Sequence, residues 1–510
     1  MKTLRLSARA WTSLSRRPRG SLARALRWSS LVGALCAGVL ASAPSAHADR
    51  PPRAPAPPGT AVTPLSPMIP RVPSPTVTAK KVVLENGLTV LLHEDHRVST
   101  VSVNVTYHVG SKDEAPGKNG FAHLFEHVMF QGSKHVAEDT FFRHLEEVGG
   151  TGINGTTNND RTNYYETVPS NRLELALWLE SDRMGFLLDH VDQATFDSQR
   201  EVVKNERRQN YENAPYGLVG QAVRAEIFPS GHPYHLLTIG SPKDLDAASL
   251  DDVRTFFRTW YVPANATLAL AGDFDEAGAL ALVRKYFGPI VSRPLPVRAP
   301  PAPVKLAETV TIDVDADVEL ARAYVTWPSP AFFAPGDADL DLAARSLTAG
   351  KTSRLYKRLV YDLQIAQGVF ASQASMQLAS SFEIVATAKP GHTAAELVKV
   401  IDEELVALRE RGVAPDELAR AKVSTRADAI FGMERVGARA NLLNMYFQYT
   451  GDADYFAKDL ERYEAATADS VRDAARTHLV ERGRVVTLVT PKKGAPVAGV
   501  VVRVQRGGAS

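Results

Sequence analysis

The chain has 510 residues, a formal net charge of +2 and one cysteine, which suggests two to four domains and excludes a small module held together by disulfides. Its first 48 residues hold eight Lys or Arg and no acid, so the remainder is mildly acidic, with a formal net charge of −6. That balance argues against a nucleic-acid partner.

Residues 1–48 have the pattern of a secretory signal peptide: a basic start, an apolar run at 31–40, and Ala46-His47-Ala48 before Asp49. We therefore expect export, to the periplasm or the medium of a bacterium. A mitochondrial transit peptide is the less favoured alternative. The apolar run is too short for a transmembrane anchor and nothing later approaches that length, so the mature chain should carry no anchor.

A proline-rich tether is predicted over residues 49–76, because ten prolines at 50–75 cannot build a core. An N-terminal domain over 77–292 follows, beginning with two β-rich runs around Asn86-Gly87. Its further elements are expected to be a strand at 100–108 with one face buried, a strand pair at 151–168, helices at 171–188 and 193–210, and a buried strand at 267–273.

A second linker, residues 293–305, is marked by five prolines between Pro294 and Pro303. Residues 306–492 then repeat the earlier order of strands and helices in outline, before a tail at 493–510. The sequence therefore predicts an α+β fold of two homologous α/β-sandwich halves, each a mixed sheet with helices packed on one face, joined by the linker.

One motif in the first half carries chemistry: His123-Leu124-Phe125-Glu126-His127. On a helix, His123 and His127 lie one turn apart, and Glu126 projects from the same side. Two imidazoles at that spacing can grip one zinc ion, while the carboxylate acts on a water in an open coordination position. The spacing H-x-x-E-H is the inverted zinc-peptidase signature.

Chance would place such a pattern in this composition only on the order of a few per cent of the time. The apolar flanks indicate a buried helix, on which charged groups need partners. A catalytic zinc site needs a third protein ligand, and Glu201 and Glu206 on the charged helix at 193–210 are both candidates. Spacing alone does not choose between them.

The chain resembles the pitrilysin/insulinase family of zinc peptidases, and especially its processing-peptidase-like bacterial members. The resemblance covers residues from about 80 to 490 and rests on an ordered set of blocks: Asn86-Gly87-Leu88, Val109-Gly110-Ser111, Gly120 with HLFEH, Gly149-Gly150 with Asn154 and Thr157, VVKNERRQ, and Tyr261-Val262-Pro263-Ala264-Asn265.

The resemblance implies one zinc ion per chain, held by His123, His127 and Glu206, with Glu201 as a reserve ligand. It also implies that Glu126 is the general base. Many relatives place a second glutamate seven residues before the third ligand, where it supports that ligand from behind. Here that position is Gln199.

Substrate contacts are implied in both halves. The strand containing Asn154 would border the cleft and add the substrate backbone as a strand. In the second half relatives carry an Arg and a Tyr that hold the substrate; here Arg358 is present, but Gln367 stands where the Tyr is expected. Paired bacterial relatives divide these roles between two chains, so we expect a homologous partner subunit or a homodimer.

The expected reaction is zinc-dependent hydrolysis of peptides or unfolded polypeptide, enclosed in a clamshell of such halves, with Glu126 taking a proton from a zinc-polarised water and returning it to the leaving amine. A catalytically silent scaffold is the alternative from another class, although silent copies tend to lose the motif. A structural zinc protein is a weaker alternative, because four protein ligands would then be expected.

Overall fold

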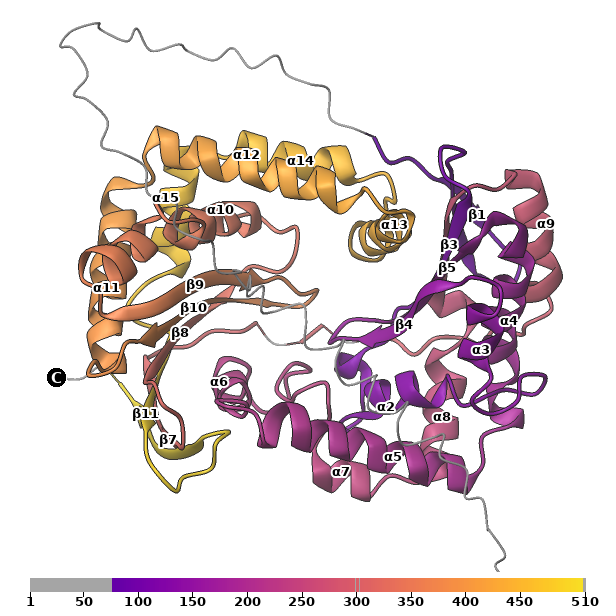
Figure 1. Ribbon diagram of the computed structural model, residues 1–510, viewed down its shortest axis with the longest axis horizontal. Coiled ribbons are helices and arrows are strands. Elements are labelled where there is room, and N and C mark those ends of the chain that lie inside the picture. Colours follow the sequence, from indigo (N-terminus) through magenta and orange to yellow (C-terminus); the bar gives the residue numbers. More distant parts are fainter. Residues whose placement is uncertain (1–75, 299, 302, 508–510) are drawn as a thin grey trace, which may run out of the picture. The chain divides into compact units, whose positions relative to one another are not determined.

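The computed structural model describes residues 76–298, 300–301 and 303–507, and the predicted leader and nearly all of the tether lie outside them. Within this range the chain forms two six-stranded mixed sheets with helices, which confirms the predicted α+β fold of two similar halves (Figure 1). In this part of the chain, every helix is too short or too polar to cross a bilayer.

The first sheet has the strand order β1-β2-β6-β3-β5-β4, in which only β2 and β6 run parallel. The two β-rich runs around Asn86-Gly87 pair as a hairpin, with Gly87 at a φ of 88° that favours glycine. The strands are β1 Lys80–Val83, β2 Thr89–Glu94, β3 Thr100–Tyr107, β4 Thr151–Thr157, β5 Thr162–Pro169 and β6 Ala266–Gly272.

Eight α-helices accompany this sheet in the described part of the first half: α2 Phe121–Val128, α3 Phe141–Glu146, α4 Leu173–Phe186, α5 Gln193–Arg207, α6 Val219–Ile227, α7 Pro242–Asp246, α8 Leu250–Trp260 and α9 Glu276–Phe287. The helix predicted over 193–210 is α5 followed by a π-helical turn, Arg208–Glu212. Asp192 caps α5 by accepting a hydrogen bond from the Thr195 amide at 2.9 Å.

The second sheet repeats this plan with the order β12-β7-β11-β8-β10-β9, in which β7 and β11 are the parallel pair. Its strands are β7 Val310–Ala316, β8 Arg322–Ser329, β9 Ala366–Ala374, β10 Ser380–Ala388, β11 Val485–Pro491 and β12 Val500–Arg506. Its helices are α10 Asp337–Thr348, α11 Ala394–Arg411, α12 Pro415–Gly432, α13 Val436–Thr450, α14 Phe456–Ala465 and α15 Ala468–His478.

The predicted tail at 493–510 needs correction, because β12 lies within it. This strand pairs antiparallel with β7 and forms one edge of the second sheet. Its sequence, VVVRVQR, is rich in β-branched residues, which favour extended backbone. All of its side chains are exposed, so the burial pattern typical of a strand is absent.

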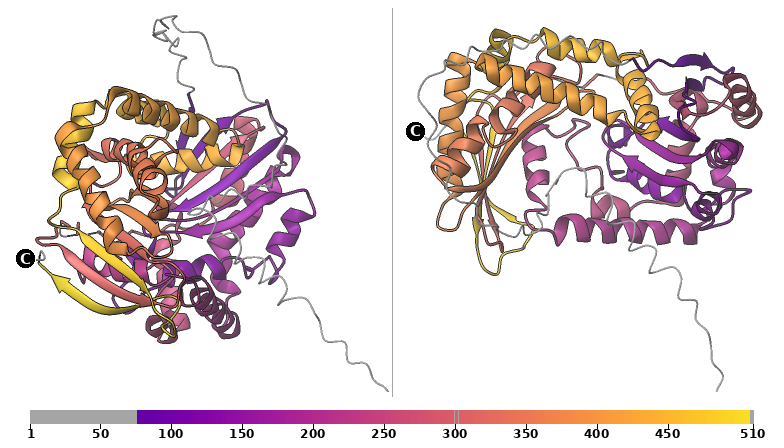
Figure 2. Two further views of the ribbon diagram at one scale, coloured as in Figure 1. Left: turned by 60° about the vertical axis from the view of Figure 1, so that its left-hand side comes forward. Right: turned by 45° about the horizontal axis from the view of Figure 1, so that its top comes forward.

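Each sheet is covered on its second face by a helix that comes from the other half. Leu443 and Tyr446 of α13 pack with Leu91 and Ala269 of the first sheet, and Figure 2 shows this helix beside those strands. In return α6 packs against β7 and β11, where Val223, Ile227, Ile312 and Val485 share one apolar cluster. The predicted halves therefore exchange helices, and each completes the core of the other.

This exchange changes the environment of β3, which was predicted to bury one face only. Val101, Val103 and Val105 face the first half's own core, but the polar face is buried as well. There Asn444 of α13 donates hydrogen bonds of 3.0 Å to the side-chain oxygens of Asn104 and Thr106. The buried side chains of Asn104 and Thr106 thus have hydrogen-bond partners on a helix of the second half.

Candidate metal centre

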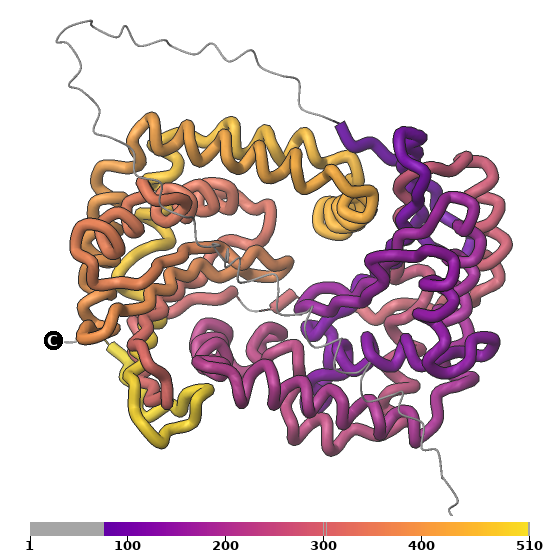
Figure 3. Tube along the Cα trace, in the orientation of Figure 1, coloured from indigo at the N-terminus to yellow at the C-terminus, as the bar shows by residue number. Residues whose placement is uncertain are grey.

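The predicted motif lies on α2, a helix whose residues are almost all buried. Helix α2 runs beside α5 and contacts β4 (Figure 3). The rings of His123 and His127 meet edge to face with centroids 4.9 Å apart, as expected for residues one helical turn apart. Both imidazoles therefore face α5, the helix that carries the two candidate third ligands.

Glu206 completes a three-residue cluster with these histidines. Its Oε2 lies 3.2 Å from His127 Nε2 and 3.7 Å from His123 Nε2. The three donor atoms lie within 4.8 Å of one another, and within the described residues no other group of His, Cys, Asp and Glu side chains meets the same condition. Ligands of a tetrahedral zinc, at bonds of 2.0–2.1 Å, would be about 3.4 Å apart, so this donor set fits the ion.

The charges in the cluster also suit a cation. Burial lowers the pKa of His123, and the neighbouring His127 lowers it further. Burial alone would raise the pKa of Glu206, but the hydrogen bond from His127 and the charges of both imidazoles outweigh it, so the net shift is downward. The lowered pKa of His123 favours its neutral imidazole and the lowered pKa of Glu206 favours its carboxylate, which are the forms in which these two side chains bind metal.

Glu201 lies apart from the cluster. It is five residues before Glu206, which places it about 140° further around α5. Its carboxylate pairs with Lys204 at 2.9 Å, and Lys204 also contacts Asp246 at 2.6 Å. Glu201 is thus an exposed ion-pair residue, the ordinary state of a carboxylate on a charged helix.

Support for Glu206 comes from a residue that sequence reasoning missed. Asn210, one turn later in the π-helical segment, donates from Nδ2 to Glu206 Oε1 at 3.4 Å. Gln199 is partly buried two turns earlier on α5, on the same face as Glu206. The family's spacing predicts a supporting residue at position 199. The hydrogen bond to Glu206 instead comes from Asn210, which no sequence pattern indicates.

Glu126 is held in place by strand β4. Thr157 donates from Oγ1 to Glu126 Oε2 at 2.6 Å, and Glu126 is 4% exposed. A Cβ atom at Gly155 would lie 3.0 Å from Glu126 Cγ, so a side chain there would crowd the carboxylate. Thr157 belongs to the block that carries the family resemblance, but only the packing of β4 against α2 shows what Thr157 and Gly155 do.

Asn154 lies on β4, which is the edge strand of the first sheet. It pairs in register with Tyr165, and its Oδ1 accepts a hydrogen bond from the Gly155 amide at 2.9 Å. In the described structure no further strand pairs with the other edge of β4.

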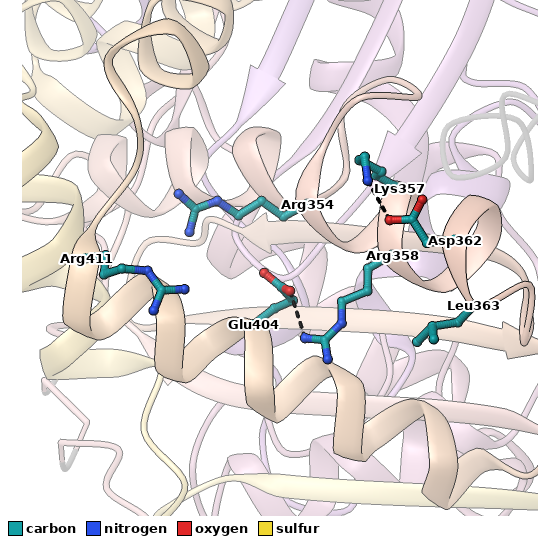
Figure 4. A pocket seen from close by; sticks show the side chains of 7 residues that line it. All are labelled: Arg354, Lys357, Arg358, Asp362, Leu363, Glu404 and Arg411. Atoms are coloured by element: carbon teal, nitrogen blue, oxygen red, sulfur yellow. Dashed lines mark hydrogen bonds and ion pairs between the residues drawn. The ribbon is translucent and has the colours of Figure 1, made fainter.

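Arg358 and Gln367 lie in the second half, away from these contacts. Arg358 lines a pocket of about 420 Å³, and its guanidinium donates to Glu404 at 2.9 Å (Figure 4). It also pairs with Glu403 of α11. Gln367 is exposed on β9, the edge strand of the second sheet. Arg358 is thus neutralised by two acids, and no tyrosine stands at position 367.

Comparison with known proteins decides the family. Residues 89–232 match the family described as Insulinase (Peptidase family M16), and residues 247–424 match the Peptidase M16 inactive domain. The chain belongs to the M16 peptidase family. The match to the inactive domain begins in the last part of the first half and continues into the second half, and no H-x-x-E-H motif lies within residues 247–424.

Individual M16 relatives agree with this assignment. The chain is 29% identical over 374 residues to zinc protease PqqE of Helicobacter pylori, covering 72% of this chain and 83% of that protein. It is 26% identical over 415 residues to an uncharacterized zinc protease of Streptomyces coelicolor, covering 79% and 88%. A solved protease structure from Helicobacter pylori superposes with a TM-score of 0.76 at 27% identity, covering 82% of this chain and all of that one.

Proposed function

We propose that this protein is a zinc-dependent endopeptidase. The observation that carries the proposal is the convergence of His123 and His127 on α2 with Glu206 on α5, beside a carboxylate, Glu126, that lies outside the three-ligand set. Three protein ligands leave a fourth position for water, which is the arrangement of a catalytic rather than a structural zinc site.

In this reaction one zinc ion per chain, held by His123, His127 and Glu206, would supply a Lewis acid that polarises water and the scissile carbonyl. Glu126 Oε2 is occupied by Thr157, so Oε1 is the oxygen that takes the proton from the attacking water. The same oxygen then gives that proton to the amine nitrogen as the peptide C–N bond breaks. Thr157 keeps the carboxylate in one orientation through both transfers.

The substrate is best matched by an extended polypeptide. The open edge of β4 offers backbone hydrogen-bonding groups beside Glu126, and a peptide that adds there as a strand would place its own backbone near the metal centre. Hydrogen bonds to the substrate backbone depend little on side-chain identity. They therefore favour peptides and unfolded segments of varied sequence as substrates over one particular folded protein. Asn154 is the side chain on that strand that we assign to substrate binding.

A catalytically silent scaffold is the competing function. The match of residues 247–424 to the Peptidase M16 inactive domain gives it some support. The first half argues against it, because the three proposed ligands lie together in one cluster and the proposed base, Glu126, is buried and hydrogen-bonded to Thr157. A silent subunit has no need to keep a carboxylate hydrogen-bonded beside three metal ligands.

The test is metal content measured together with peptide cleavage. The purified protein should contain close to one zinc per chain and cleave an unstructured peptide, lose cleavage on dialysis against a chelator, and recover it on addition of zinc. Zinc binding without any cleavage, in every assembly state tested, would favour the scaffold. Cleavage that survives complete removal of metal would contradict the proposal.

A partner subunit is part of the proposal. Since Arg358 is paired with Glu403 and Glu404 and Gln367 replaces the expected tyrosine, the second half offers little to hold a substrate. A homologous chain that keeps the Arg/Tyr pair would supply it, and a homodimer is the alternative. The mass of the native complex isolated from its own host distinguishes the two.

Arg358→Ala is expected to change kcat/KM of the active assembly by less than about threefold, because the guanidinium is already committed to two acids. The measurement is initial-rate kinetics on an unstructured peptide, with the exposed ion-pair variant Arg420→Ala as the matched control. A loss of tenfold or more, with Arg420→Ala unchanged, would show that Arg358 holds substrate and that no partner residue replaces it.

Localisation is proposed from the leader alone. The basic start, apolar run and Ala46-His47-Ala48 favour export to the periplasm or medium over import into mitochondria.

A further inference from the structure

Helix α2 begins at a residue that cannot cap it. Gly120, its N-cap, has a φ of 101° and no side chain, so it lacks the oxygen that Ser, Thr, Asn or Asp would supply. A larger residue does not fit, because a Cβ atom at position 120 would lie 2.7 Å from the Gly240 Cα atom. The first amides of the metal-binding helix therefore need an acceptor from elsewhere in the chain.

Glu114 supplies that acceptor from six residues upstream. Its Oε1 accepts the Ala122 amide at 2.9 Å, and its Oε2 accepts the Gly120 amide at 3.0 Å. Oε2 also accepts the Asn119 Nδ2 group at 3.0 Å. All three groups donate, so both carboxyl oxygens act as acceptors. Burial raises the pKa of Glu114 to about 8, and the hydrogen bonds from the Ala122 and Gly120 amides oppose that rise.

Contacts at the start of α2 also connect it to α5. Asn119 donates from Nδ2 to the Leu237 carbonyl at 3.2 Å, which ties the start of α2 to the loop at 237–241. Gly240 of that loop touches Gly120 on one side, and its carbonyl accepts Arg207 Nη1 at 2.9 Å on the other. Arg207 directly follows Glu206, so the loop links the beginning of α2 to the third ligand's own helix.

We propose that Glu114 is a positioning residue of the metal centre. By holding the Gly120 and Ala122 amides it sets the first turn of α2, which carries His123, at the place from which both imidazoles reach Glu206. Helix α2 has only eight residues, and so short a helix depends on such outside contacts for its stability. This inference rests on the proposed zinc site, but it concerns metal affinity and does not require that the protein cleave peptides.

The alternative is that Glu114 merely stabilises the domain, as any helix cap does. Asp275 offers the matched control: it is the N-cap of α9 in the same half and accepts the Gly278 amide at 2.7 Å. Asp275→Ala removes one helix cap without touching α2, α5 or the loop between them. A general loss of stability would appear in both variants, whereas a loss of zinc affinity belongs to the Glu114 variants alone.

The experiment measures zinc affinity of the full chain by competition with a chromophoric chelator, together with the absorption spectrum of the cobalt-substituted protein. Glu114→Gln keeps the size of the side chain but turns one of its two acceptors into a donor, and Glu114→Ala removes both. We expect zinc affinity to fall by about 10–100-fold, the range for residues that orient metal ligands, and the cobalt spectrum to change. Asp275→Ala should leave both readouts as in the wild type.

Wild-type zinc affinity and cobalt spectrum in Glu114→Gln would overturn the inference, as would an equal loss of affinity in Asp275→Ala. If Glu114→Gln failed to fold while Asp275→Ala folded, Glu114 would be needed for folding as a whole and the inference would also fail. Absence of zinc binding by the wild-type chain is a different outcome, which would instead refute the proposed function.

Discussion

Glutamine in place of Glu126 is expected to leave zinc in the protein and to lower the rate of peptide cleavage by about 10²–10⁴-fold, the usual contribution of a positioned acid or base. The amide has the volume of the carboxylate, and its oxygen can still accept the hydrogen bond that Thr157 donates at 2.6 Å. It cannot accept a proton from water. The loss should therefore fall on kcat, with KM and metal content close to those of the wild type.

The measurement pairs kcat on an unstructured peptide with zinc per chain, using the assembly in which the wild-type protein is active. Glu201→Gln is the matched control, because it makes the same chemical change at an exposed ion-pair residue on α5. Turnover retained in Glu126→Gln with full zinc would show that another group takes the proton. Loss of zinc as well would mean that Glu126 contributes to metal binding and not to proton transfer alone.

Glu206→Gln is expected to lose most of its zinc, whereas Glu201→Gln should keep it. Removing one of the three proposed protein ligands should lower zinc affinity by more than the roughly 10–100-fold that follows from altering a residue that only orients a ligand. Glu206 Oε2 lies 3.2 Å from His127 Nε2, and an uncharged amide there is a much poorer ligand. Glu201 contributes only the exposed pair with Lys204, which is worth little to stability or to the metal.

Zinc content after dialysis at a fixed free zinc concentration decides between the two residues, with circular dichroism to verify that each variant is folded. Glu201→Gln serves as the control for Glu206→Gln, because it makes the same chemical change on the same helix five residues away. Retention of zinc in Glu206→Gln together with its loss in Glu201→Gln would transfer the ligand assignment to Glu201.

The contacts that supporting residues make around the site could not be predicted from sequence patterns. Thr157, Asn210 and Glu114 are held against the motif by the pairing of β4 with α2, by a π-helical turn and by a loop that precedes the helix. None of these arrangements has a fixed sequence spacing. Gln199, at the position where relatives place a supporting glutamate, is partly buried on α5.

The sequence by itself determined the contacts that depend on helix and strand period. His123, Glu126 and His127 share one side of α2 because an α-helix has 3.6 residues per turn. The hairpin around Asn86-Gly87, the strand pair at 151–168 and the repeated order of elements follow from turn residues and apolar spacing. Spacing left Glu206 and Glu201 open because both lie on one charged helix, and only the tertiary structure shows that Glu206 lies beside the two histidines whereas Glu201 pairs with Lys204. The tertiary structure also decided that α13 and α6 cover the sheets of opposite halves, since an apolar helix face specifies that it is buried but not which sheet buries it.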